Sequence, residues 1–346
     1  MTHQLYAPIR DIHGHADALE TLLHKLGYTR QPPHGAQHGA PQGHYAHPEG
    51  RQVIFLGDLI DRGTQNKRVV EIARAMERAG SALVLMGNHE LNAIGYATPR
   101  AGAEGEFLRP HTPENQKQHA ETLADYRDPD EHRDLVSWLK TLPAWIDLGD
   151  LRAVHACWRR ASMERLVALG LVEERPVEGA PGAVAGFIRF DDPRFELLYT
   201  KGEEPFELVE VLLKGVERRL PNGLSFLDKG GKERHETRVR WWLAARPETW
   251  GAAALEAERA FADLPFAPED DYERYTDETP VFVGHYWLRL DGPDAHEGQP
   301  RPLAPSVYCL DWSVTRGALV AFRLARRGGR GAGALGEFVW ARRVWI

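Results

Sequence analysis

The sequence is short of cysteine, of basic charge and of long apolar runs. Its 346 residues include two cysteines, Cys157 and Cys309, which cannot form a disulfide framework and therefore predict a reducing, cytoplasmic environment. The formal net charge of −7 argues against a surface that follows nucleic-acid phosphates. That charge discounts a nucleic acid as partner or substrate but does not exclude it. Since no apolar run reaches membrane-spanning length and the first residues lack a signal-peptide pattern, we expect no membrane partner.

One short stretch organises the chain. Residues 52–56, Gln-Val-Ile-Phe-Leu, have the β-branched and aromatic character of a strand, which Gly57 ends. Asp58, Asp61 and Arg62 follow at once, in the loop after the strand. Such loops carry the chemistry in α/β folds, although an Asp/Gly turn with solvated charges would look the same in isolation.

Four other predicted strands also deliver polar groups where they end. Each of these side chains alone is more often structural, but carboxyl ends of parallel strands lie at one sheet edge, so the conjunction predicts a common site. The groups are Asp11 and His13 after residues 5–9, Asn88 and His89 after 82–86, His155 after 151–154, and His285 after 281–283. Carboxylates, imidazoles and a carboxamide suit a pair of divalent ions such as Mn²⁺, Fe or Zn²⁺. Such a pair, about 3.5–4 Å apart, can clamp a phosphate and generate hydroxide for in-line attack.

Three of these runs resemble the signature motifs of calcineurin-like metallophosphoesterases. They are DIHG at 11–14, GDLIDRG at 57–63 and GNHE at 87–90. The seven-residue second motif resembles the phosphoprotein phosphatase branch, which includes serine/threonine phosphatases, lambda-type phosphatases and bacterial diadenosine tetraphosphate hydrolases of the PrpE-like kind. The resemblance covers residues 5–96 and recurs at His155 and His285, and is weak elsewhere.

The resemblance implies a role for each matching residue. Asp11 and His13 would hold the first ion, Asp58 would bridge both, and Asn88, His155 and His285 would complete the second. His89 would be the general acid, oriented by Asp61, and Arg62 would bind a phosphate oxygen. It implies two divalent ions, with Mn²⁺ first and Fe, Zn²⁺ or Ni²⁺ as alternatives.

One residue departs from the family pattern. Arg10 stands where the family usually has glycine, directly before Asp11. Glycine there lets the backbone turn closely past the metals, whereas arginine is tolerated if φ is negative. The departure leaves Asp11 and His13 in place, so it puts full activity in question more than metal binding.

We expect a single α/β (α+β) domain over residues 1–346. The resemblance implies a central β-sandwich of two mixed sheets flanked by helices. Residues 97–130 look like a polar loop, and residues 160–275 look like a mostly helical insertion or cap. Within that cap, Arg238, Arg240 and Trp241, with its neighbour Trp242, are candidate substrate contacts, although the tryptophans could equally anchor the cap to the sheet.

These features together predict a di-metal phosphoesterase in which a metal-bridged hydroxide attacks phosphorus directly. The expected substrate is a dinucleoside polyphosphate such as diadenosine tetraphosphate, or another phosphorylated small molecule. The first alternative is a serine/threonine protein phosphatase acting on a phosphoprotein. The second is a non-catalytic metal-binding scaffold, which would have no need of His89, Asp61 and Arg62.

Overall fold

The computed structural model describes residues 4–32, 43–227, 231, 233–243, 245–255, 259–266, 274–290, 295–314, 318–324 and 336–342. Its first sheet is mixed, because three parallel strands are extended on one side by two antiparallel ones. In spatial order these strands are β17 (Gly336–Arg342), β16 (Ala318–Leu324), β1 (Tyr6–Ile9), β4 (Gln52–Phe55) and β5 (Ala82–Val84). The central strand β1 is buried along its whole length, as its apolar sequence predicts.

The second sheet is also mixed. Its parallel half pairs β14 with β15 and β7, and its antiparallel half continues through β6. In spatial order the strands are β15 (Val307–Cys309), β14 (Val281–Val283), β7 (Arg152–Val154), β6 (Pro143–Asp147), β9 (Val184–Ile188) and β8 (Val172–Pro176). Strands β6 and β7 form the hairpin that Gly149-Asp150 predicted.

Aromatic side chains join the two sheets face to face. The rings of Phe282 on β14 and Tyr308 on β15 lie 5.5 Å and 4.8 Å from the ring of Phe322 on β16. Phe322 in turn lies 5.0 Å from Phe338 on β17. The apolar faces of both sheets belong to one buried cluster, and the predicted architecture of two mixed sheets flanked by helices is confirmed.

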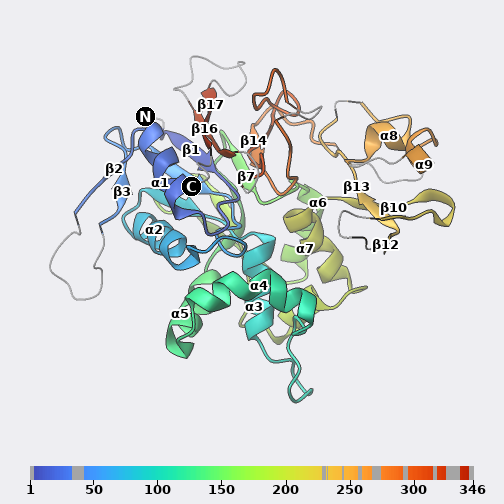
Figure 1. Ribbon diagram of the computed structural model, residues 1–346, viewed down its shortest axis with the longest axis horizontal. Coiled ribbons are helices and arrows are strands. Elements are labelled where there is room, and N and C mark those ends of the chain that lie inside the picture. Colours follow the sequence, from blue (N-terminus) through green and yellow to red (C-terminus); the bar gives the residue numbers. More distant parts are fainter. Residues whose placement is uncertain are drawn as a thin grey trace.

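Helices cover the outer sides of the sandwich (Figure 1). Helix α1 (Ala16–Lys25) packs on β16 and β17, and α2 (Asn66–Arg78) packs on β5, both through apolar faces of helical periodicity. Further helices are α3 (Asn88–Ala97), α5 (Pro129–Leu139), α6 (Arg160–Ala168) and α7 (Glu204–Lys214), with α6 packed on α7, and the rest are described below. None of the helices within the described ranges is long and apolar enough to cross a membrane.

The expected loop at 97–130 contains a helix. Helix α4 (Pro113–Asp125) begins with a proline in its first turn, and the Thr112 side chain accepts a hydrogen bond from the backbone N–H of Asn115. Its buried residues are His119 and Thr122, which are polar. The loop interpretation was wrong because apolar periodicity, the main sign of a helix, is missing from a helix that buries polar groups.

The region 160–275 is less helical than its sequence suggests. Residues 172–176 and 184–188 form β8 and β9, which extend the second sheet, so this part is not a helical cap. The remainder holds the short helices η1 (Pro193–Tyr199), η2 (Pro221–Gly223), α8 (Trp250–Ala253) and α9 (Arg259–Ala262), and the strand pairs β10 (Glu217–Arg219) with β13 (Glu236–Arg238) and β11 (Phe226–Leu227) with β12 (Glu233–Arg234). Several of these lie at the right-hand edge of Figure 1.

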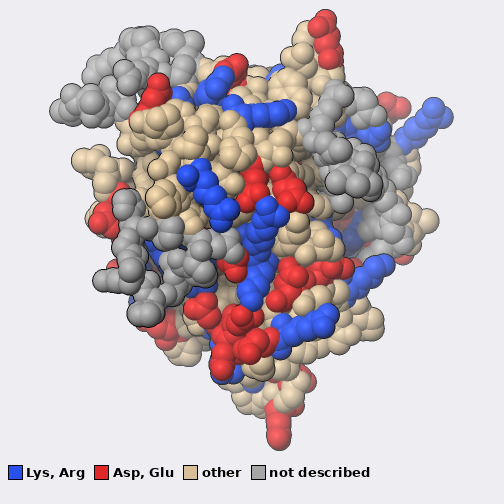
Figure 2. All heavy atoms as spheres, turned by 60° about the vertical axis from the view of Figure 1, so that its left-hand side comes forward, with Lys and Arg blue, Asp and Glu red and all other residues tan. Residues whose placement is uncertain are grey.

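The surface carries both signs of charge. A further pair of short strands, β2 (Thr29–Arg30) and β3 (Tyr45–Ala46), lies beside the first helices. On the face that contains this side of the molecule, Lys and Arg side chains are interspersed with Asp and Glu (Figure 2). That face therefore has a mixed surface rather than a continuous basic one.

Gly57 makes the sharp turn that directs Asp58 into the sheet edge. Its φ is +89°, and a Cβ there would lie 2.6 Å from Gly87 Cα and 2.8 Å from His155 Nδ1. Gly80 has a similar φ of +67° with open space around it. We expect Gly57→Ala to lower the free energy of unfolding by several kcal/mol, and Gly80→Ala by about 1 kcal/mol, since it adds backbone strain alone. Urea unfolding of both variants measures the difference, and equal losses would contradict this account of the close approach.

Candidate metal centre

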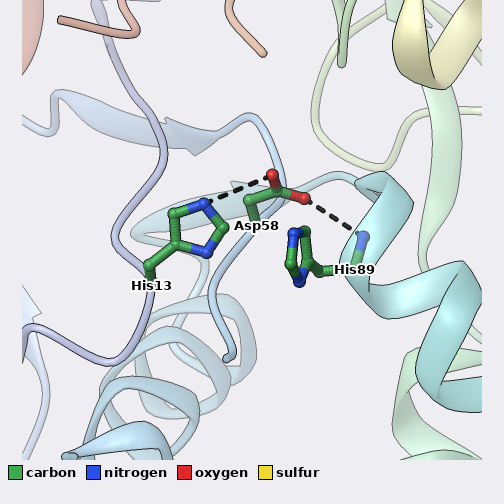
Figure 3. A group of neighbouring side chains, drawn as sticks. All are labelled: His13, Asp58 and His89. Atoms are coloured by element: carbon green, nitrogen blue, oxygen red, sulfur yellow. Dashed lines mark hydrogen bonds and ion pairs between the residues drawn. The ribbon is translucent and has the colours of Figure 1, made fainter. Parts of the chain in front are cut away.

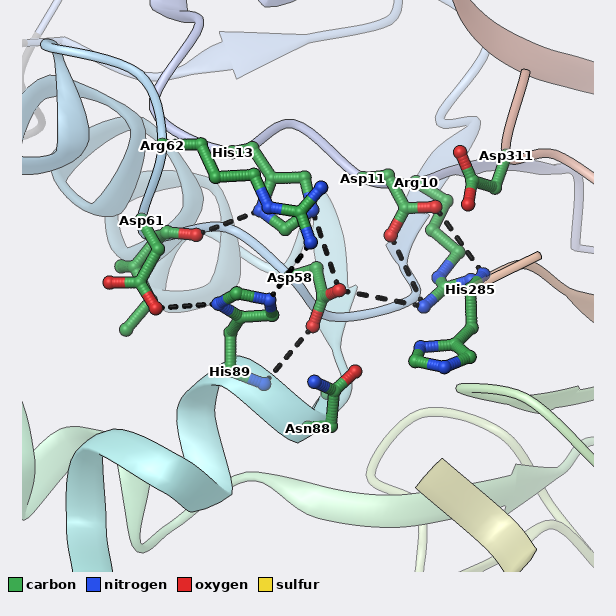
Figure 4. Close-up of polar contacts among 12 residues, drawn as sticks. Arg10, Asp11, His13, Asp58, Asp61, Arg62, Asn88, His89, His285 and Asp311 are labelled. Carbon is green, nitrogen blue, oxygen red and sulfur yellow. Dashed lines mark hydrogen bonds and ion pairs between the residues drawn. The ribbon is translucent and has the colours of Figure 1, made fainter. Parts of the chain in front are cut away.

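The five strand ends bring the predicted side chains to one buried place (Figure 4). They arrive from different elements and are all at most 8% exposed: Asp11 and His13 after β1, Asp58 and Asp61 after β4, Asn88 and His89 at the start of α3, His155 after β7, and His285 after β14. Arg62 is exposed at the edge of this group. The structure thus brings the side chains that follow these strands to one edge, and their roles stay predictions.

The backbone is strained where these side chains emerge. Six residues of the site have positive φ: Asp11, His13, Asp58, Asp61, Arg62 and His285. Left-handed backbone costs a non-glycine residue on the order of 1 kcal/mol, and such strain tends to gather at functional sites. Arg10 is not among the residues with positive φ, so its conformation is compatible with a side chain.

Lone pairs converge between Asp58, Asn88 and His155. Nδ1 of His155 lies 2.8 Å from the carbonyl oxygen of Leu56 and donates to it, so Nε2 carries a lone pair. That Nε2 lies 2.9 Å from Asn88 Oδ1 and 3.2 Å from Asp58 Oδ1. These three acceptors face one another, so a positive charge beside them is favourable. His285 adds to this cluster, since both of its ring nitrogens are buried without a hydrogen-bond partner.

A second group of possible ligand atoms comprises His13, Asp58 and His89 (Figure 3). Nδ1 of His13 lies 2.9 Å from the carbonyl oxygen of Ile60, which leaves Nε2 as the acceptor. Nε2 is buried without a hydrogen-bond partner, 3.5 Å from Asp58 Oδ2. Asp58 is thus shared by both groups, as the bridging role requires.

Asp11 lies apart from both groups of ligand atoms. Its Oδ1 is 3.2 Å from Arg10 Nη2, and its other oxygen accepts a hydrogen bond from the His285 backbone N–H. Burial raises the pKa of Asp11 well above its ordinary value, and the neighbouring carboxylate of Asp311 raises it further despite Arg10. The pKa of Asp58 moves the other way: burial raises it, but His155 and His89 together hold it well below the ordinary value.

His89 belongs to a chain of hydrogen bonds that the sequence did not disclose. Its Nδ1 lies 2.5 Å from Asp61 Oδ2, and Asp61 Oδ1 accepts from His119 Nδ1 at 2.7 Å and from Thr122 Oγ1 at 2.6 Å. Burial alone would lower the pKa of His89, but the charges of Asp58 and Asp61 raise it above the ordinary value. Helix α4 therefore fixes Asp61, and Asp61 fixes the orientation of His89.

Arg62 stacks on an aromatic ring that sequence reasoning also missed. Its guanidinium carbon lies 3.8 Å from the centre of the Trp287 ring, and its Nη2 lies 3.4 Å from His89 Nε2. Trp287 is 42% exposed, and its backbone N–H donates to Asp311 Oδ2 at 2.6 Å. Trp287 carries no local motif, and only its position two residues after His285 could have suggested it.

The cap residues differ in their surroundings. Trp241 is buried and donates from Nε1 to Tyr286 Oη at 2.7 Å, and Trp242 stacks edge-on with the same tyrosine. Arg240 donates to backbone carbonyls of residues 252 and 254. The two tryptophans therefore have the anchoring contacts that were the alternative to substrate binding, and Arg240 is bound to backbone within the same region. Arg238 is half-buried. Burial lowers the pKa of His285 well below its ordinary value, and the charge of Arg238 lowers it further. Arg238 is therefore the substrate candidate that remains from this set.

Glu90 ties the loop after β4 to the start of α3. Its Oε2 accepts from the backbone N–H groups of Asp58 and Gly87, and its Oε1 from that of Leu59, each at 2.8 Å. Burial and the charge of Asp58 raise the pKa of Glu90 to about 7. The GNHE motif contains this residue, but no role was predicted for it.

We expect Glu90→Gln to destabilise the chain, because an amide offers one acceptor oxygen to three N–H groups. The loss should be about 1–3 kcal/mol for each donor left without a partner. Glu77→Gln is the control, since Glu77 is half-buried and its hydrogen bond from Trp138 Nε1 at 2.8 Å survives with an amide oxygen. Denaturant unfolding of both variants measures this, and similar losses would show that Glu90 has no special role.

Comparison with known proteins finds similarity in the part of the chain that holds most of the site. Residues 11–170 match the model of the calcineurin-like phosphoesterase family. The bis(5′-nucleosyl)-tetraphosphatase PrpE [asymmetrical] of Halalkalibacterium halodurans is 37% identical over 81 residues, which cover 23% of this chain and 29% of that protein. The protein of the same name from Bacillus subtilis is 37% identical over 84 residues, or 24% and 30% of the two chains. The chain thus spans less than a third of the length of these curated relatives.

The structural comparison is weaker. A cold-active protein tyrosine phosphatase superposes with a TM-score of 0.41 at 15% identity, covering 92% of this chain and 74% of that one. The sequence match, by contrast, contains the predicted motifs and four of the five strand ends that form the site. The chain is therefore similar to calcineurin-like phosphoesterases over residues 11–170.

Proposed function

We propose that this chain is a metal-dependent hydrolase of phosphoric esters or anhydrides. The observation that carries the proposal is the position of Asp58, which faces unpartnered imidazole nitrogens on two sides while the His89–Asp61 pair and Arg62 lie beside it. A scaffold that only binds metal would need Asp58 and the imidazole nitrogens, but would not need the His89–Asp61 pair or Arg62. The combination fits phosphoryl transfer to water.

The donor set fits a divalent ion. Buried nitrogens without a hydrogen-bond partner, on His13 and His285, and the shared carboxylate of Asp58 are ligands that Mn²⁺, Fe, Zn²⁺ or Ni²⁺ accept. Asn88 and His155 lie beside the same carboxylate, and Arg10 stands between it and Asp11. Such an ion supplies a Lewis acid that activates water and neutralises phosphate charge.

His89 would donate the proton that the leaving oxygen needs. Asp61 accepts from Nδ1, so Nε2 is free to act on a substrate, and the raised pKa keeps the imidazole protonated to higher pH than an isolated histidine. Arg62 Nη2 lies 3.4 Å from that Nε2. A phosphate bound by Arg62 would therefore present its leaving oxygen to the acid.

A dinucleoside polyphosphate is the substrate that we propose first. The matched relatives are named as bis(5′-nucleosyl)-tetraphosphatases, although they share only part of their length with this chain. The exposed ring of Trp287 lies next to the phosphate-binding Arg62, and an aromatic surface there suits a nucleotide better than a phosphoserine side chain. A serine/threonine phosphatase activity is the alternative.

A substrate panel tests the choice. With Mn²⁺, we expect faster hydrolysis of diadenosine tetraphosphate than of phosphopeptides or linear and cyclic nucleotides. Chromatography of the products would distinguish symmetric from asymmetric cleavage. A preference for phosphopeptides would favour the alternative, and the lack of hydrolysis with any divalent metal would favour the scaffold.

Two variants should separate chemistry from metal binding. We expect His89→Asn to lower kcat by about 10²–10⁴-fold while metal still binds, because general acid catalysis contributes factors of that size. Asp58→Asn should lose both metal binding and turnover. His24→Asn, an exposed histidine on α1, is the matched control and should leave both unchanged. Metal content and turnover are measured on the same samples, and a His89→Asn variant with normal kcat would remove the acid assignment.

A further inference from the structure

The guanidinium of Arg10 lies inside the ligand cluster. Arg10 is 1% exposed, and Nη2 lies 3.2 Å from Asp11 Oδ1 and 3.9 Å from Asp58 Oδ2. The same nitrogen also contacts Nε2 of His155, the ring nitrogen that carries the lone pair. Figure 4 shows the side chain between Asp11, Asp58 and His285. Thus two carboxylates and one imidazole of the expected metal-binding set already face a positive charge.

This charge is permanent and deeply buried. An arginine does not lose its proton in proteins, and a buried guanidinium is tolerated only when it is paired. Nε and Nη1 of Arg10 have no hydrogen-bond partner, so the pairing depends on Nη2 and on the groups just named. The ligands stabilise Arg10 in the way that they would stabilise a metal ion.

The surrounding chain leaves room for the side chain. A Cβ at Gly284, directly before His285, would overlap Nη1 and Cδ of Arg10. Arg10 itself has no positive φ, in contrast to Asp11 after it. The position before Asp11 therefore accepts an arginine without backbone strain, and the glycine at 284 accommodates its length.

We infer that Arg10 is a built-in cation that takes the place of one of two metal ions, so that the native chain binds one divalent ion. This inference rests on the metal-dependent site proposed above. Arg10 contacts His155 and Asp58, two of the three members of one ligand group, so the displaced ion is the one that His155 and His285 would hold. The remaining ion belongs to His13 and Asp58. Repulsion between a guanidinium and an adjacent divalent ion opposes double occupancy.

The test counts metal ions. Titration calorimetry with Mn²⁺ and the metal content after dialysis should give one equivalent for the native chain and two for Arg10→Gly and Arg10→Gln. Electron paramagnetic resonance adds a readout that does not depend on turnover, since only the variants should show an exchange-coupled Mn²⁺ pair. Arg133→Gln, an exposed position on α5, is the control and should bind one equivalent.

Variants of the ligands secure the result if the Arg10 variants do not fold. In the native background His13→Ala should abolish Mn²⁺ binding, whereas His285→Ala should retain one equivalent. Two equivalents in the native chain, or loss of binding in His285→Ala, would overturn the inference. If the native chain binds one equivalent and the Arg10 variants bind two, but no substrate is hydrolysed, the inference stands and the proposed function fails. If the native chain hydrolyses substrate and binds two ions, the proposed function stands and the inference about Arg10 fails.

Discussion

The site depends on the carboxylate of Glu90. Three backbone N–H groups from two different strand ends converge on it, and it joins the loop after β4 to the start of α3 together with the hydrogen bond from His89 N–H to Asp58. Asp58 and Asn88 stand on those two segments, so the distance between them follows from this one side chain. Buried backbone donors need partners, and here the partner also sets the geometry of the ligands.

The sequence disclosed the side chains that follow a strand. Asp58, His155 and His285 come directly after apolar runs, and the rule that parallel strands end at one sheet edge was sufficient to bring them together. The two mixed sheets also followed from the resemblance. Residues that reach the site from other helices and loops could not be predicted, because no local sequence pattern indicates them.

His119 and Trp287 show why the remainder could not be predicted. His119 lies on a helix whose buried side is polar, so neither its helix nor its contact with Asp61 leaves a periodic apolar pattern. Trp287 reaches Arg62 through tertiary packing across a loop with a left-handed backbone. The same limit applied to β8 and β9: exposed charges dominate β8, and its place in the sheet comes from pairing with β9.

The stacking of Arg62 on Trp287 affects the entropy of binding. A free arginine on the surface samples many rotamers, and ordering it on a ligand lowers the affinity. Here the indole ring and the nearby imidazole of His89 already restrict the guanidinium. The loss of rotamer freedom thus occurs when the chain folds, and a phosphate bound there, as we propose, would meet an arginine that is already ordered.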